Sequence, residues 1–188
     1  MTTLDRHIRQ QLLREAEGYL ELVTVLGERY EVTTKVRENL VHRALKLLRR
    51  MKDESQVSDF ETLYLEGEAL RTLQRYEEAI RPLTAASHRD PTNIHVCLAL
   101  AWCYKRIARL DMAIESLEEA LVVDPTEPIL YYNLACYWSL AGNVRQAVRY
   151  LAESFDLDPN YRDLTAEESD FDPIRDDPAF QAVTSVIV

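Results

Sequence analysis

The feature that most constrains this chain is a segment that occurs three times. The stretches RYEEAIRPLTAASHRDP, RLDMAIESLEEALVVDP and NVRQAVRYLAESFDLDP align without gaps. Their shared alanines, Ala79, Ala113 and Ala147, recur at an interval of 34 residues, and an Asp-Pro pair ends each segment at the same interval. A period of this length is typical of helix–turn–helix units that stack to bury a common core. The sequence therefore predicts helical hairpins arranged in series.

Side-chain size within the repeat predicts how the helices pack. A small residue lies twelve positions before each shared alanine, a large residue lies nine positions before it, and a leucine follows four positions after it. These residues are Gly67, Ala101 and Ala135; Leu70, Tyr104 and Trp138; and Leu83, Leu117 and Leu151. Small residues let two helix backbones approach where they cross, and large residues fill the space beside the crossing.

This pattern resembles the tetratricopeptide repeat family. The three repeats are residues 60–93, 94–127 and 128–161, within a predicted repeat domain 58–161. The resemblance implies an all-α fold, an α-solenoid of helix–turn–helix repeats, that serves as a protein-binding scaffold. Gly142 then occupies a turn at which a left-handed residue ends a helix. Pro82 lies inside the second helix of the first repeat, where it removes a backbone hydrogen bond. We expect that helix to be kinked or to start late.

The residues before the repeats, 1–57, predict an N-terminal amphipathic helical hairpin. Apolar residues recur every three or four positions over 4–27 and again over 33–52, the spacing of helices with one buried face. The hairpin is a possible degenerate repeat, joined to the first repeat by a mostly polar linker, residues 53–57. Ser58, with a glutamate three residues later, predicts the start of the next helix.

The residues after the repeats, 162–188, predict C-terminal capping helices. A solvated helix over Tyr161 to Glu168, capped by Asn160, should cover the exposed face of the third repeat, as terminal repeats require. Asp177 as N-cap and Pro178 in the first turn predict a closing helix through Val183.

Charge and composition narrow the class of partner. The chain has 188 residues and a net charge of −10, and all of the excess acid follows residue 59, because residues 1–59 have a net charge of +1 and residues 60–188 of −11. Such a surface repels phosphates, so we expect no nucleic acid partner. A basic stretch, residues 35–52, is interpreted as the solvated face of a helix, with an acidic partner or membrane surface as the alternative. We expect no membrane span, no secretory leader, and a cytoplasmic protein whose three cysteines stay reduced.

The predicted binding surface is a stripe on the first helix of each repeat. The stripe lies about 100° from the packing residues and should line the concave side. Its residues are Glu61, Tyr64, Glu68 and Arg71; His95, Leu98, Trp102 and Lys105; and Ile129, Tyr132, Cys136 and Ser139. Aromatic and apolar groups dominate its middle, and the lysine, arginine and asparagine residues of a carboxylate clamp are mostly missing. We therefore expect the stripe to bind an extended or helical segment of another protein through apolar pockets.

Two alternatives to an open groove follow from the same residues. Trp102 and Tyr132 can instead pack against the neighbouring repeat, or be covered by the long N-terminal helix. The apolar face of the N-terminal hairpin, with Val186 to Val188, can instead pair with a second copy across a two-fold axis. The protein would then be a self-associating structural module.

The sequence contains no recognisable catalytic or cofactor motif. There is no Gly-rich phosphate loop, GxSxG, HExxH or CxxC, so we expect a protein that is not an enzyme and that has no cofactor and no metal site. Cys97 is interpreted as a buried packing residue. Four acidic residues near the C-terminus lack the spacing of an EF-hand and are interpreted as a solvated cap. They are Glu167, Glu168, Asp170 and Asp172.

Overall fold

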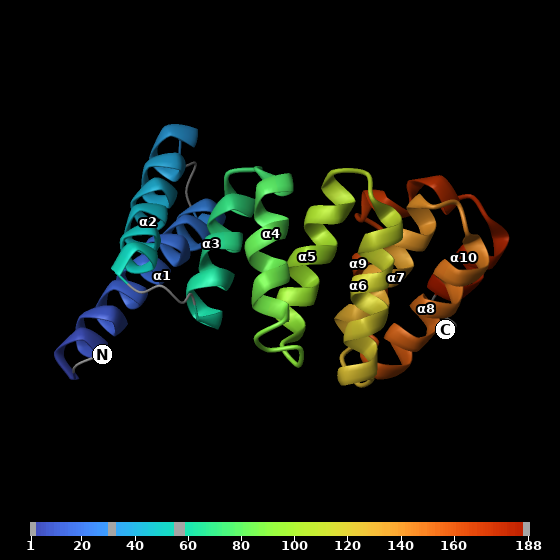
Figure 1. Cartoon of the computed structure of the whole chain (residues 1–188). Helices are drawn as coiled ribbons and strands as arrows, with labels where there is room; N and C mark the ends of the chain where they lie inside the picture. The colour runs from blue at the N-terminus through green and yellow to red at the C-terminus, as the bar shows by residue number, and fades with distance from the viewer. Residues whose placement is uncertain (1–2, 30–32, 55–58, 186–188) are drawn as a thin grey trace. The chain divides into compact units, whose positions relative to one another are not determined.

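The computed structural model describes residues 3–29, 33–54 and 59–185. Within these ranges the chain forms α-helices and one 3-10 helix, and no strand (Figure 1). The elements are α1 (Thr3–Arg29), α2 (Thr34–Glu54), α3 (Phe60–Thr72), α4 (Tyr76–Ser87), α5 (Ile94–Arg106), α6 (Leu110–Val123), α7 (Pro128–Leu140), α8 (Val144–Leu157), α9 (Tyr161–Leu164), η1 (Ser169–Ile174) and α10 (Pro178–Thr184). They group into two compact units, Met1–Pro91 and Thr92–Val188. Among the described helices, none combines the length and the apolar character needed to cross a bilayer.

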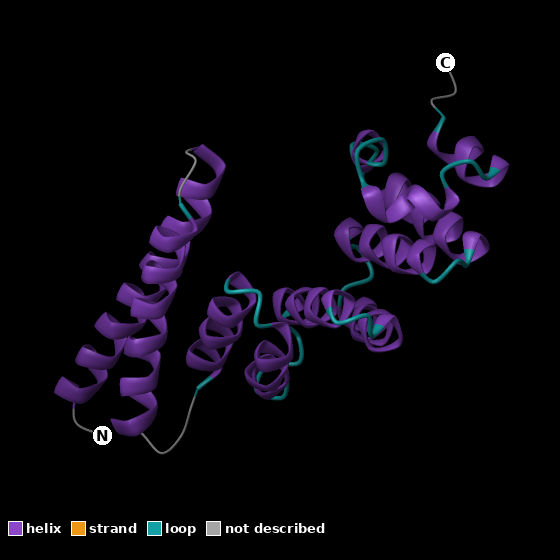
Figure 2. Cartoon of the chain, turned by 90° about the horizontal axis from the view of Figure 1, so that it is seen from above, coloured by secondary structure: helices purple, strands orange, loops and turns teal. Residues whose placement is uncertain are grey.

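In the first unit, the predicted N-terminal hairpin is formed by α1 and α2, which lie side by side (Figures 1 and 2). Ala16 on α1 meets Ala44 and Leu48 on α2 in a buried cluster, where the small side chains allow close packing. The side chain of Lys52 lies outside the described part of the chain. The remaining basic residues of the 35–52 stretch are solvent-exposed, namely Lys35, Arg37, Arg43, Lys46, Arg49 and Arg50.

The first repeat consists of α3 and α4, which approach closely at Gly67. A Cβ atom at this position would lie 2.4 Å from Cγ of Leu83 on α4, so a larger residue does not fit without movement. The predicted crossing is therefore confirmed. The predicted late start of the second helix is wrong, because α4, α6 and α8 begin at equivalent positions of the repeat. Pro82 lies on the buried face of α4 beside Ala79, and this packing holds the helix together across the missing hydrogen bond.

The start of α3 is capped by Asp59. Its carboxylate accepts hydrogen bonds from the backbone N–H of Thr62 at 3.0 Å and from the Thr62 hydroxyl at 2.5 Å. A carboxylate at this position also interacts favourably with the positive end of the helix dipole. The predicted cap, Ser58, lies outside the described residues, as do residues 55–57 of the predicted linker.

The turn between the two helices of each repeat has the same backbone form three times. Gln74, Ala108 and Gly142 occupy equivalent positions with φ angles of 59°, 60° and 72°. In each turn the next N–H donates to a carbonyl five residues back, at 2.9 Å, which satisfies the end of the first helix. The prediction of a left-handed residue at Gly142 is confirmed, and two other residue types adopt the same conformation.

The second unit packs α5 to α8 with the C-terminal elements around one core. Seven of the thirteen residues of α7 are buried, which means that the helix is covered on more than one face. One face of α7 is covered by η1, which places Phe171 and Ile174 in the core.

The C-terminal elements differ from the prediction. The helix expected over Tyr161 to Glu168 is wrong, because α9 ends at Leu164. The side chain of Arg175 donates hydrogen bonds to the carbonyls of Thr165 at 3.1 Å and Glu168 at 2.8 Å, and so takes acceptors that a longer helix would use. The chain instead turns into η1.

The two predicted C-terminal caps have different outcomes. Asn160 makes no side-chain capping bond, because its amide donates to Asp158 at 2.8 Å. Asp177 caps α10 as predicted, accepting from the N–H of Ala179 at 2.8 Å, and this helix ends one residue beyond the predicted Val183.

Candidate functional site

The stripe residues of the first unit lie on α3. Tyr64 is half-buried and stacks on Phe60 with 5.9 Å between ring centroids and 9° between planes. Glu68 and Arg71 pair with each other through two hydrogen bonds of 2.9 and 2.6 Å. Burial and the Glu68 carboxylate raise the pKa of Tyr64, and Arg71 opposes this effect, so the phenol stays neutral. The two aromatic rings are therefore the uncharged part of this surface.

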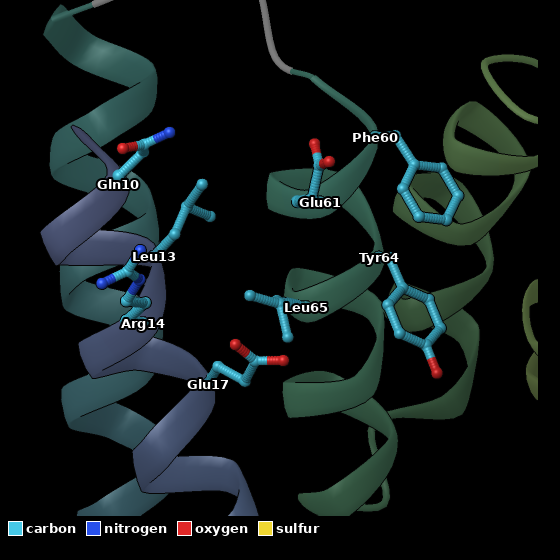
Figure 3. A pocket seen from close by; sticks show the side chains of 8 residues that line it. All are labelled: Gln10, Leu13, Arg14, Glu17, Phe60, Glu61, Tyr64 and Leu65. Atoms are coloured by element: carbon cyan, nitrogen blue, oxygen red, sulfur yellow. The ribbon is translucent and has the colours of Figure 1, made fainter. Parts of the chain in front are cut away.

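A pocket of about 370 Å³ lies between α1 and α3. Figure 3 shows Leu13 and Glu17 of α1 projecting toward Leu65 of α3, while Tyr64 points to the other side of α3. Gln10, Arg14, Phe60 and Glu61 also line the pocket. Its leucines offer apolar surface and its rim carries charges of both signs, which is typical of a site for an amphipathic segment.

A polar contact joins α1 to the start of α3. Arg9 on α1 donates to the Asp59 carboxylate at 2.5 and 3.0 Å and to the Thr62 hydroxyl at 3.1 Å. Burial would raise the pKa of Asp59, but the hydrogen bonds from Thr62 and Arg9 outweigh it and lower that pKa. The ionised carboxylate thus both caps α3 and holds α1 against it.

The stripe residues of α5, in the second unit, are partly accessible. His95 is exposed, Leu98 is half-buried, and Trp102 is 38% exposed. The Lys105 ammonium lies 5.1 Å from the centroid of the Trp102 ring. A large aromatic surface with a cation beside it is a common energetic centre of protein contacts.

The stripe residues of α7 are mostly covered by the chain itself. Ile129 is half-buried, but Tyr132 and Cys136 are 6% and 2% exposed, and Ser139 is completely buried. The cover comes from the C-terminal segment, residues 161–174, whereas the sequence pointed to a neighbouring repeat or the N-terminal helix.

The covering segment makes three kinds of contact. The Tyr132 ring lies 5.2 Å from the ring of Tyr161 and 5.7 Å from that of Phe171, which meets it edge-on. The Ser139 hydroxyl donates to the backbone carbonyl of Asp170 at 2.7 Å. The Lys105 ammonium donates to the carboxylate of Asp170, and the two side chains are 16% and 11% exposed. The prediction of a solvated acidic cap is therefore wrong for Asp170, because this carboxylate is buried against a lysine.

Cys136, Glu168 and Asp170 place one ligand-type atom each within 4.8 Å of one another. Such atoms can bind a metal ion when the thiol is ionised. Burial, together with the carboxylates of Asp170 and Glu168, raises the pKa of the Cys136 thiol well above its ordinary value. Lys105 already neutralises Asp170. The donor set therefore fits a buried ion pair beside a neutral thiol better than a metal site.

The other predicted thiol position is also unsuited to nucleophilic chemistry. Cys97 is half-buried, and burial together with Glu119 raises its pKa. A thiol with a raised pKa forms little thiolate at neutral pH. This agrees with its interpretation as a packing residue.

Sequence reasoning missed two parts of the site. The first is the face of α1 that lines the pocket, with Leu13 and Arg14. The second is the pair Asp170 and Phe171. An available signal was the break in the helical spacing after Leu164, where FDPI places apolar residues three apart around a proline.

Comparison with known proteins agrees with this architecture. Residues 70–136 match the family model for the tetratricopeptide repeat. No curated protein sequence matches the chain. The solved structure of YrrB, described as a tetratricopeptide protein with an unusual peptide-binding site, is 19% identical over 81% of this chain and 74% of that chain, with a TM-score of 0.58. Two structures of MamA are 18% and 21% identical, cover 82% and 85% of this chain and 87% and 99% of theirs, and have TM-scores of 0.61 and 0.60. Residues 70–136 therefore match the tetratricopeptide repeat, and the chain has the all-α fold of helical hairpins seen in these solved structures.

Proposed function

We propose that this protein is a non-enzymatic scaffold that binds a segment of another protein on the first-helix faces of its repeats. The observation that carries the proposal is the pocket between α1 and α3, which stays open while the equivalent face of α7 is covered. Leu13 and Leu65 offer an apolar contact surface in the pocket, and the stacked rings of Phe60 and Tyr64 lie on the other side of α3 (Figure 3). Aromatic anchors of this kind dominate the energy of protein interfaces.

The shape and charge of the pocket indicate the kind of segment it takes. About 370 Å³ accommodates more than one apolar side chain. The charged residues that line the pocket, Arg14, Glu17 and Glu61, carry both signs. An amphipathic helix or extended segment meets these conditions, because it presents apolar anchors on one side and polar groups on the other.

A second contact surface is proposed on α5 of the second unit. Leu98, Trp102 and Lys105 lie on one face of this helix, and Trp102 keeps over a third of its surface exposed. This surface and the α1–α3 pocket belong to different units.

The net charge of −10 supports a protein partner over a nucleic acid. The cysteines are present as thiols, which is compatible with action in a reducing compartment such as the cytoplasm.

The proposal is tested by photo-crosslinking from defined positions. A photoreactive amino acid at Glu61, which lines the pocket, or at Trp102 should capture a partner, and the same group at the exposed second-helix positions Glu115 or Glu153 should not. With the captured partner purified, Leu65→Ala should weaken binding at least tenfold, and Leu65→Met should preserve it. Equal capture from all four positions would contradict the proposal.

The alternative function is self-association through the N-terminal hairpin. Apolar side chains are exposed on α1 and α2, which is the observation that favours it; they are Ile8, Leu22, Val25 and Val36. Val186 to Val188, which the sequence analysis includes in this interface, lie outside the described residues. Light scattering at tens of micromolar tests the alternative. A monomer over this range would remove it, and a dimer dissociated by Leu22→Glu would support it.

A further inference from the structure

The C-terminal segment lies on α7 as a peptide ligand would lie on a receptor. Asp170 gives its side-chain carboxylate to Lys105 and its backbone carbonyl to the Ser139 hydroxyl. The next residue, Phe171, is completely buried and meets the ring of Tyr132 edge-on. Two consecutive residues thus supply an anion, a backbone acceptor and an aromatic anchor. Lys105, Ser139 and Tyr132 supply the complementary cation, donor and ring.

These contacts are the kinds that make short peptides specific. A charged hydrogen bond in a partly buried site is stronger than one between neutral groups. An aromatic side chain contributes a large apolar area with a preferred ring geometry. The three receptor side chains belong to the stripe predicted for partner binding, and they come from two helices, α5 and α7.

The covering segment does not continue the repeat. It is a short 3-10 helix, begun by the Glu168 side chain, which accepts from the N–H of Asp170 at 3.0 Å. It also leaves part of the receptor surface unsatisfied, because the buried Tyr132 hydroxyl has no hydrogen-bond partner among the described residues. Buried hydroxyls without partners are uncommon and costly. A peptide with an acceptor near this hydroxyl would therefore bind the same surface better.

We propose that the surface formed by Lys105, Tyr132 and Ser139 recognises acidic–aromatic peptide segments, in which an aspartate precedes an aromatic residue. The chain's own residues 168–174 occupy this surface as an internal ligand. The inference rests on the proposed scaffold function and names the chemistry of one partner. A tethered ligand has an effective concentration of roughly millimolar, so a partner peptide must bind tightly enough to displace the internal segment. Substitutions that weaken the internal contacts should therefore make the site accessible.

The test uses the full chain and a labelled synthetic peptide with the sequence of residues 166–176, AEESDFDPIRD. Fluorescence anisotropy should show at least tenfold tighter binding to the Asp170→Asn variant than to the wild type, because the amide weakens the internal contact with Lys105. Adding Lys105→Gln to this variant should remove the gain. A peptide with alanine in place of phenylalanine should not bind. Equal affinity for wild type and Asp170→Asn, or equal binding of the alanine peptide, would overturn the proposal.

If the circular dichroism spectrum of the Asp170→Asn variant shows a loss of helix, hydrogen exchange on the wild type tests the proposal instead. The amides of residues 169–172 and 174 should exchange through local opening, faster than the core amides of α7. Exchange of both at one rate would show that the segment is an inseparable part of the core, and the proposal would fail. Crosslinking from Glu61 reports on the α1–α3 pocket, which belongs to the other unit. Capture at Glu61 without peptide binding would therefore remove this inference and leave the scaffold function standing.

Discussion

Lys105 on α5 and Asp170 on η1 form an ion pair across 65 residues of sequence. The pair ties the first helix of the second repeat to the segment that covers α7, and both side chains are largely withdrawn from water. Because both side chains are largely buried, each charge is stabilised by the other. An unpaired ion at this site would have lost its hydration without a compensating partner.

Breaking this pair should lower stability measurably. Lys105→Met or Asp170→Asn should each reduce the free energy of unfolding by about 1.5–3 kcal/mol. The double variant should lose less than the sum of the two, since neither residual charge remains. Urea unfolding followed by circular dichroism measures both quantities. The exposed pair Arg109 and Asp111 is the control, and its disruption should leave the unfolding curve almost unchanged. Additive effects of the two buried substitutions would argue against coupling.

Gly67→Ala should destabilise the first repeat by about 1–3 kcal/mol, because the added methyl group overlaps Leu83, which is fully buried and has little room to move. Gly18 lies within α1 with no neighbouring atom within 4 Å of an added Cβ. Gly18→Ala should therefore stabilise the protein by about 0.5–1 kcal/mol through better helix propensity. Thermal unfolding of the two variants makes the comparison. Similar shifts of the same sign would contradict the close approach at Gly67.

The three left-handed turns form a matched series. Ala108→Gly should stabilise the chain by about 0.5 kcal/mol, because relief of left-handed strain slightly exceeds the entropy that glycine adds to the unfolded state. Gly142→Ala should lower the free energy of unfolding by about 1 kcal/mol, because it places a Cβ atom on a residue in the left-handed conformation. Chemical unfolding of both variants beside the wild type tests the series. A loss of stability in Ala108→Gly would show that the alanine turn is not strained.

Asp59→Ala should remove a cap and one link between α1 and α3. The loss at neutral pH should be about 1 kcal/mol, mostly from the cap, since the Asp59 side chain is 38% exposed and its ion pair is screened. The pKa of Asp59 is lowered from its ordinary value of 3.8, so its contribution is present above that pH and is lost as pH falls through the lower value of the folded state. Unfolding curves of wild type and variant should therefore converge in acid. A difference that stays constant down to about pH 2 would contradict this assignment.

The helical hairpins were predictable because each depends on residues close in sequence. Gly67 faces Leu83 within one repeat, and the turn at Gly142 is set by local torsions. The C-terminal cover was not predictable in this way. α9 stops where Arg175 binds the carbonyls of the residues that follow it, and Asp170 is buried because Lys105 lies opposite. Both are tertiary contacts that leave no periodic pattern.

The residues of the candidate site differ in the same way in how far the sequence predicts them. Tyr64 and Trp102 lie on half-buried or exposed faces of their helices, as the repeat spacing predicts. Tyr132 and Cys136 follow the same spacing but are buried, because the spacing of a repeat carries no information about what covers it. The spacing defines a face of a helix, and the neighbouring chain decides whether that face is accessible.

The burial of Cys136 beneath the C-terminal segment makes this thiol a built-in reporter. Cys103, on α5, is equally inaccessible, but it is not one of the stripe residues. An alkylating reagent therefore reaches Cys136 whenever the segment lifts, and reaches Cys103 when the helices themselves separate. The ratio of the two labelling rates would measure how often the chain uncovers its own inner face, with no substitution needed.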